Sequence, residues 1–136
     1  MRFFITDANV LIDLIKYNWL NSFFHLDIDV NTTYAVLDQL YAWQQEELKR
    51  HIFSNRLHLV LIDNSHYVSA EVSLTEKGLS IQDRRILIAA HKLHATFLTA
   101  DNLIRKTSLK HNIPVHGLIW IIQKMIEKEL LDPDET

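Results

Sequence analysis

The fold is decided near the N-terminus, in the stretch RFFITDANVLIDLI of residues 2–15. Residues 2–6 predict a short apolar strand, and Asp7 stands where that strand ends. A strand that stops on an acid and turns directly into a helix places that acid on the rim of a sheet. In open α/β sheets this rim, at the carboxyl ends of the strands, is where ligands bind. The helix is predicted from apolar residues that recur at helical spacing, namely Val10, Leu11, Leu14 and Ile15.

The composition is that of an ordinary globular domain. A length of 136 residues predicts one domain over residues 1–136, large enough for a core without disulfides or structural metals. There is no basic signal-peptide region, no apolar run of roughly 18–20 residues and no cysteine, and we therefore expect a cytoplasmic protein. The net charge of −3 gives no overall attraction to nucleic acid, so any phosphate binding would need local basic groups.

Strand and helix patterns alternate along the chain. This alternation predicts an α/β fold with a central, mainly parallel sheet. Pro114 places the last strand at a sheet edge, because proline cannot donate a ladder hydrogen bond. Gly78 is a left-handed stop signal for a helix over residues 65–77. The strands are predicted at residues 2–6, 27–30, 57–62, 95–99 and 113–116.

The region after the second strand predicts a helix with an apolar inner face. Asn31, Thr32 and Thr33 offer side-chain oxygens that can cap its first turn. The residues expected to be buried on this helix are Val36, Leu37, Leu40 and Tyr41.

Three acids, Asp7, Asp83 and Asp101, each stand at the start of a predicted helix. Aspartate is a favoured capping residue, so each has an ordinary structural explanation, and Ser80 with Asp83 has the spacing of a capping box. However, Asp7 and Asp101 each follow a predicted strand, and parallel strands bring both to one rim. Three carboxylates gathered there repel one another unless a cation neutralises them, and hard divalent ions take such oxygen ligands.

Four segments resemble one family. ITDANVLI at residues 5–12, LSIQD at 79–83 and LTADNLIRK at 98–106 look like the acidic motifs of PIN-domain ribonucleases. IPVHGLIW at 113–120 is similar to the last strand and helix of bacterial members. The resemblance implies a three-layer α/β/α PIN-like (Rossmann-like) domain that hydrolyses RNA with Mg²⁺ or Mn²⁺. Many members are VapC-type toxins inhibited by an antitoxin protein, and many form homodimers.

The same resemblance assigns roles to individual residues. It implies that Asp7, Asp83 and Asp101 are the catalytic metal ligands, a role that suits a metal-assisted attack of water on a phosphodiester. Asn9 and Thr99 would be supporting polar groups that hydrogen-bond a ligand or a water. Ordinary bonding at a helix start and a strand end explains Asn9 and Thr99 equally well.

Gln39 departs from the family pattern. Relatives usually carry a glutamate in the motif that here reads VLDQL, residues 36–40. A glutamine oxygen can still ligate a hard cation, but it adds no charge and cannot act as a base. Neither nearby acid is a simple replacement. Asp38 is rotated by about 100° around the helix, and Glu46 would lie roughly 10 Å along a continuous helix.

Basic residues follow two of the three acids. Arg84 on one helix and Arg105 on another could bind RNA phosphates, although a solvated helix face explains each of them alone. His91 and His94 lack convergent partners, and we interpret them as structural or surface residues.

Two other functions compete with the nuclease. The glutamine at position 39 is compatible with a non-catalytic PIN-like module that binds RNA or a protein. A phosphatase-like domain with Asp7 as nucleophile fits less well, because its second acid would be needed where Asn9 stands.

Overall fold

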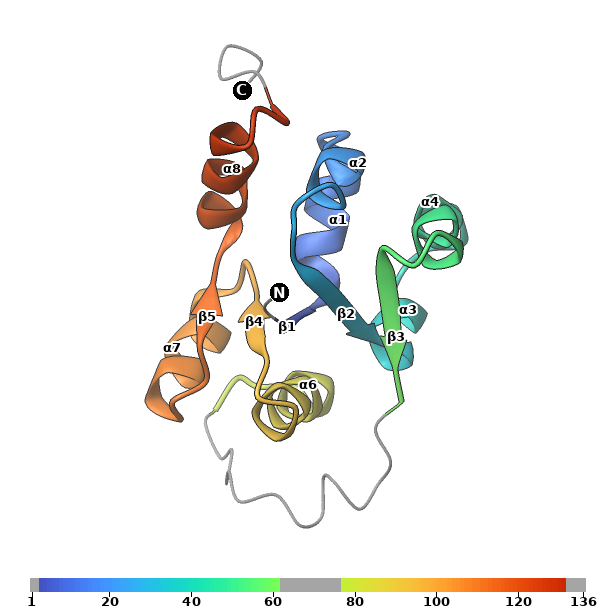
Figure 1. Ribbon diagram of the computed structural model, residues 1–136. Coiled ribbons are helices and arrows are strands. Elements are labelled where there is room, and N and C mark those ends of the chain that lie inside the picture. Colours follow the sequence, from blue (N-terminus) through green and yellow to red (C-terminus); the bar gives the residue numbers. More distant parts are fainter. Residues whose placement is uncertain (1–2, 62–76, 132–136) are drawn as a thin grey trace.

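The computed structural model describes residues 3–61 and 77–131 and shows an α/β fold built on a five-stranded sheet (Figure 1). All neighbouring strands are parallel, and their order across the sheet is β3-β2-β1-β4-β5. The predicted α/β class is confirmed, and β5 lies at an edge as Pro114 indicated. The strands are β1 (Phe3–Thr6), β2 (Asp29–Thr33), β3 (Leu57–Val60), β4 (Thr96–Leu98) and β5 (Val115–His116).

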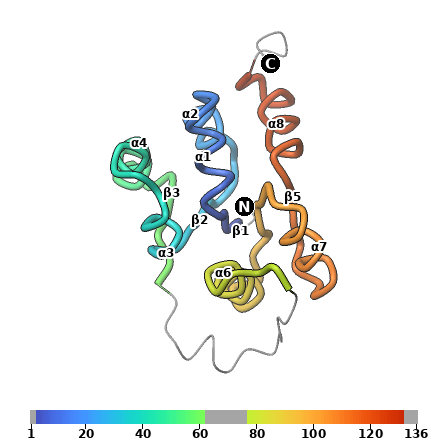
Figure 2. The backbone as a smooth tube through the Cα atoms, turned by 180° about the vertical axis from the view of Figure 1, so that it is seen from behind, coloured from blue at the N-terminus to red at the C-terminus, as the bar shows by residue number. Residues whose placement is uncertain are grey.

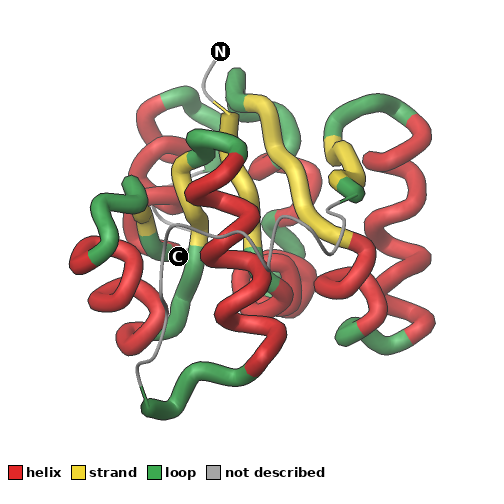
Figure 3. The backbone as a smooth tube through the Cα atoms, turned by 90° about the horizontal axis from the view of Figure 1, so that it is seen from below, coloured by secondary structure: helices red, strands yellow, loops and turns green. Residues whose placement is uncertain are grey.

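Helices cover both faces of this sheet. Helices α1, α2, α4 and α8 lie on one side, where α1 packs against α4 and α2 against α8, while α6 and α7 lie on the other (Figures 1 and 2). Viewed from below, α6 crosses in front of the central strands (Figure 3). The helices are α1 (Ala8–Lys16), α2 (Leu20–Phe23), α3 (Tyr34–Asp38), α4 (Ala42–Phe53), α6 (Ile81–Lys92), α7 (Asn102–Lys110) and α8 (Leu118–Glu127).

The strand order reverses direction between β1 and β4. From β1 the chain moves outward to β2 and β3, then returns to the other side of β1 to form β4 and β5. The two strands are in register from Phe4 opposite Thr96 to Thr6 opposite Leu98, so both end at the same level. The crevice at such a reversal is the usual ligand site of an open α/β sheet. Asp7 follows β1 directly and therefore stands at this point.

The core forms where the strands meet the helices. Phe4 and Ile5 of β1 and Phe97 of β4 are fully buried, as expected for a parallel sheet covered on both faces. The inner side of α1 is buried as the spacing of its apolar residues predicted, through Val10, Leu11 and Leu14. In the part of the chain that the structure describes, no helix has the length and apolar character needed to cross a membrane.

The region around β2 differs from the prediction. The strand extends to Thr33, which pairs with Val60 of β3. Asn31 and Thr32 are buried within it and donate side-chain hydrogen bonds to the carbonyls of Phe4 and Thr6. Thr33 alone caps the next helix, through its hydroxyl and the Val36 amide. That helix, α3, ends at Asp38. The expectation that Tyr41 is buried was wrong, since 72% of it is exposed where α4 begins.

Gly78 behaves as its sequence position indicated. Its φ of +93° lies in the left-handed region, which glycine adopts without a Cβ penalty. A Cβ there would also approach Leu103 of α7 to 2.8 Å, so the segment entering α6 lies against the first turn of α7. The helix predicted over residues 65–77 falls, apart from its last residue, outside the described part of the chain.

Candidate active site

Asp7 lies at the carboxyl end of β1 and caps α1. Its Oδ1 accepts a hydrogen bond of 3.0 Å from the Val10 amide, and its own amide donates to the carbonyl of Leu98 at 3.2 Å. Aspartate suits this position because its short side chain satisfies an amide that the first helical turn leaves unpaired. The bond to Leu98 also ties Asp7 to the end of β4. The acid is therefore fixed by both strands of the crevice.

Thr99 joins two of the predicted acids. Its fully buried hydroxyl donates to Oδ2 of Asp7 at 2.6 Å and accepts a hydrogen bond of 3.1 Å from the Asp101 amide. Asp101 in turn caps α7, through a 3.0 Å bond from the Ile104 amide to its Oδ1. One side chain thus holds the acid after β1 and the acid after β4 in a fixed relation.

Asp83 enters the site from the first turn of α6. Its carboxylate accepts from the Ser80 amide, and the Ser80 hydroxyl accepts from the Asp83 amide, so the predicted capping box is complete. The side chain is only half-buried. Its negative charge contributes to the raised pKa of Asp7, as does that of Asp101. Asp83 and Asp101 each therefore lie within electrostatic reach of Asp7.

Burial is the main cause that raises the pKa of Asp7 from 3.8 to about 6. The hydrogen bonds from Thr99 and Val10 favour the ionised form and oppose this rise, and repulsion from Asp83 and Asp101 adds to it. Asp7 is consequently a carboxylate at neutral pH but a poorly stabilised one. A cation placed beside it would relieve both the desolvation and the repulsion.

The acids suit a hard divalent cation in chemistry and charge, but they do not form a closed ligand set. Among residues 3–61 and 77–131, no three Asp, Glu or His side chains lie close enough together to hold a metal ion between them. Mg²⁺ is often held by one or two carboxylates and keeps several waters. The arrangement therefore fits a water-rich site better than an all-protein cage.

The supporting residues fall into two groups. The Thr99 hydroxyl bonds the Asp7 carboxylate and the backbone amide of Asp101, whereas Asn9 and Gln39 are exposed and make no side-chain hydrogen bond with an acid in the described structure. Gln39 is the C-cap of α3, so the continuous helix assumed in relating it to Glu46 is interrupted. Glu46 belongs to α4 and pairs with Lys49 in solvent. Asp38 is exposed, as predicted for a solvated acid.

The two predicted phosphate-binding arginines share an unusual feature. Arg84 on α6 and Arg105 on α7 are half-buried, and the Nε atom of each is shielded from solvent. Neither atom has a hydrogen-bond acceptor within the described ranges. A buried donor without an acceptor is uncommon and calls for an explanation, such as a ligand that supplies the acceptor.

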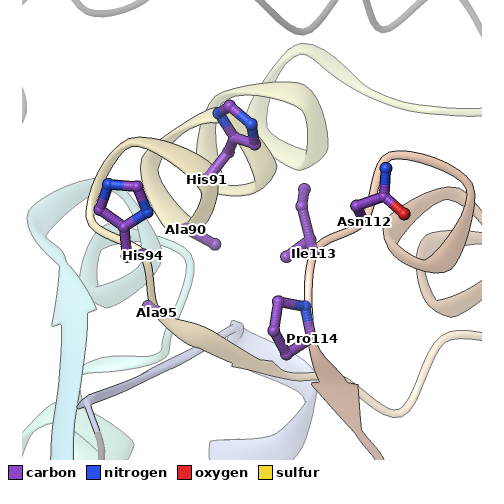
Figure 4. Close-up of a pocket in the computed structure, with 7 residues that line it drawn as sticks. All are labelled: Ala90, His91, His94, Ala95, Asn112, Ile113 and Pro114. Carbon is purple, nitrogen blue, oxygen red and sulfur yellow. The ribbon is translucent and has the colours of Figure 1, made fainter.

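A separate cavity of about 260 Å³ opens at the other end of the strands (Figure 4). It precedes β4 and β5, while the acids follow them. His91 and His94 line it from the end of α6, and Figure 4 shows their rings apart from each other rather than converging. Their interpretation as structural or surface residues is consistent with this placement. The remaining lining residues are Ala90, Ala95, Asn112, Ile113 and Pro114.

Comparison with known proteins identifies a family. The family model described as a PIN domain matches residues 3–135, which is nearly the whole chain. PIN domains are typically nucleases that act on nucleic acid and generally use divalent metal ions. No curated protein matches the chain.

Proposed function

This chain belongs to the PIN-domain family, and we propose from that premise that it is a metal-dependent ribonuclease. It would hydrolyse RNA phosphodiester bonds in the cytoplasm, as the toxin of a toxin–antitoxin pair and as a single domain over residues 1–136. The observation that carries the proposal is the buried Asp7 at the β1–β4 crevice, joined to Asp101 through the Thr99 hydroxyl. Helix capping explains a short polar side chain at position 7, but it does not explain a buried carboxylate that also accepts a hydrogen bond from the end of β4.

We assign metal binding to Asp7, Asp83 and Asp101, with Mg²⁺ or Mn²⁺ as the ion. When bound, such an ion would polarise a phosphoryl oxygen and lower the pKa of an attacking water. Thr99 orients the Asp7 carboxylate, and the pKa of about 6 leaves that carboxylate ionised at neutral pH. Asn9, exposed two residues after Asp7 in the first turn of α1, is available to hydrogen-bond a water or a substrate group.

Arg84 and Arg105 would bind substrate phosphates on either side of the bond to be cleaved. Support comes from their position near the starts of α6 and α7, beside Asp83 and Asp101. Their shielded Nε donors have no acceptor among the described residues, and a phosphate oxygen would provide one. This local charge compensates for a chain whose overall charge is negative.

The proposal is tested by cleavage of single-stranded RNA with and without Mn²⁺ or Mg²⁺. The wild-type chain should cleave only with the metal, and Asp7→Asn should reduce cleavage to the level seen in excess chelator. Asp38→Asn is the matched control, because it neutralises an exposed acid at the end of α3. Cleavage that persists in Asp7→Asn, or that resists the chelator, would contradict the mechanism.

A non-catalytic RNA- or protein-binding module is the second candidate function. It is favoured by Gln39, which replaces the acid expected at that position, and by the absence of three converging ligands in the described segments. Binding of RNA without cleavage, both in the wild-type chain and in Gln39→Glu, would support this alternative over the nuclease.

A protein partner is part of the proposal. Large apolar side chains are exposed along α4 and just before it, with 59% of Trp43 and 81% of Phe53 accessible. Tryptophan and phenylalanine are enriched where proteins contact their partners, which supports this part of the proposal. Light scattering during size exclusion tests the expected homodimer, which a monomer mass would contradict. Co-expression with the product of an adjacent small gene tests the antitoxin.

A further inference from the structure

The absence of a side chain at Gly117 leaves the space that the Arg105 guanidinium occupies. Gly117 follows β5 and is the N-cap residue of α8, twelve residues after Arg105 in the chain. A Cβ built on Gly117 would lie 2.9 Å from Cζ of Arg105 and would overlap its Nη2. The guanidinium therefore occupies the space that any other residue at position 117 would fill.

Backbone conformation does not explain the glycine. Its φ of −105° and ψ of −172° are extended values open to any residue. The neighbouring carbonyl of Thr99, at 3.5 Å from the same point, would be in ordinary contact with a Cβ. The guanidinium of Arg105 is thus the group that comes into conflict with a side chain at position 117.

This position places a positive charge at the acidic rim. The Thr99 amide donates to the His116 carbonyl at 3.1 Å, so Gly117 lies beside the end of β4. The Thr99 hydroxyl bonds both Asp7 and Asp101. The Arg105 guanidinium therefore lies beside the residue that follows β5, on the same rim as the acids. Its side chain forms no ion pair or hydrogen bond with a residue of the described ranges, and its shielded Nε lacks an acceptor. The cation is left available to a ligand.

We propose that Gly117 is a positioning residue, which keeps the Arg105 guanidinium seated at the rim as a receptor for a backbone phosphate of single-stranded RNA. The inference rests on the proposed function for its ligand. Arg105 would contact the phosphate, and Gly117 would act only through Arg105.

The experiment measures equilibrium binding of a short fluorescein-labelled single-stranded RNA by anisotropy, without divalent metal so that no cleavage occurs. Arg105→Ala should weaken binding about tenfold, as the loss of a charged hydrogen-bonded contact does. It should also reduce the salt slope by about 0.7, the value for one single-strand phosphate contact. Gly117→Ala should reproduce both effects. Lys49→Ala, which removes an exposed cation of α4, should change neither.

A double-mutant cycle separates positioning from a general structural role. In the Arg105→Ala background, Gly117→Ala should cause no further loss of RNA affinity, because the guanidinium that a Cβ at position 117 would overlap is already gone. In the Arg84→Ala background, Gly117→Ala should weaken RNA binding by the same factor as it does in the wild-type chain. The double variant Arg105→Ala/Gly117→Ala should unfold in urea like Arg105→Ala alone, so the test holds even if Gly117→Ala by itself is unstable.

Two outcomes would overturn the inference in distinguishable ways. If the wild-type chain binds the RNA and Gly117→Ala binds it equally well, or loses affinity equally with and without Arg105, then Gly117 has no positioning role. If the wild-type chain binds no RNA, the proposed function fails and the role of Gly117 fails with it.

Discussion

Replacing Asp7 by asparagine should stabilise the metal-free protein at neutral pH, although it removes the central acid of the proposed site. The carboxyl group is buried, and this is the main cause that raises its pKa from 3.8 to about 6. Ionising Asp7 in the folded chain therefore costs about 3 kcal/mol more than in the unfolded chain, at about 1.4 kcal/mol per tenfold change in acidity.

The sign of this effect depends on pH. Protonated Asp7 favours the folded state, and that advantage is complete below pH 3.8 and is lost as the pH rises through about 6. Asparagine never ionises, but it has one acceptor oxygen in place of two. It cannot accept from both the Val10 amide and the Thr99 hydroxyl, and one lost hydrogen bond costs about 1 kcal/mol. The variant should be about 2 kcal/mol more stable than wild type near pH 7.5 and about 1 kcal/mol less stable near pH 3.

Urea unfolding followed by tryptophan fluorescence in chelator measures this difference across the pH range. Other groups that titrate in the same range, His51 among them, are common to both proteins and cancel in the difference. A difference in unfolding free energy that does not vary with pH would refute the reasoning. So would a variant that is less stable at neutral pH, because both results would mean that Asp7 ionises without cost in the fold.

Three further predictions follow from contacts of the same structure. Thr99→Val should lower the free energy of unfolding by about 2–3 kcal/mol, since it leaves Asp7 Oδ2 and the Asp101 amide without their shared hydroxyl partner. It should also weaken Mn²⁺ binding in calorimetry, and unchanged metal affinity would contradict a role of Thr99 in orienting Asp7. Gln39→Glu should raise the single-turnover rate of RNA cleavage if the position faces the metal, and an equal rate would show that the missing acid is not needed. His51 is fully buried and stacks on Phe24, and burial is the main cause that lowers its pKa to about 4. The neutral imidazole therefore stabilises the fold fully above about pH 6.5, and this stabilisation is lost as the pH falls through about 4. In His51→Phe, the free energy of unfolding measured in urea should therefore decrease less as the pH is lowered. The same decrease in the variant and in wild type would refute this.

The parts of the fold that depend on local pattern could be predicted from the sequence. Asp7 was expected at a sheet rim because a strand ended there, and the capping box of Ser80 and Asp83 was legible from spacing alone. The family match over residues 3–135 confirms the resemblance drawn from the four segments. These features need only a few consecutive residues to be specified.

Features that depend on distant contacts could not be predicted. The strand β2 runs to Thr33 by pairing with β3, and Asn31 and Thr32 bond carbonyls of β1; sequence spacing reveals neither contact. Likewise, the buried His51 is defined by its stacking on Phe24, 27 positions earlier. The contact of Gly117 with Arg105 gives no sequence signal at all, since one glycine before a helix suggests only a cap.

The hydrogen bonds of Thr99 have a consequence for how the two halves of the sheet are joined. The N-terminal half of the chain supplies β1, β2 and β3, and the C-terminal half supplies β4 and β5, so the β1–β4 pairing is the seam between them. Asp7 stands on one side of that seam and Asp101 on the other. An ion bound by both acids would join the two halves of the sheet. Amide hydrogens of β1 and β4 would then exchange more slowly when the ion is bound. Substrate hydrolysis and cohesion of the sheet would then depend on the same few atoms.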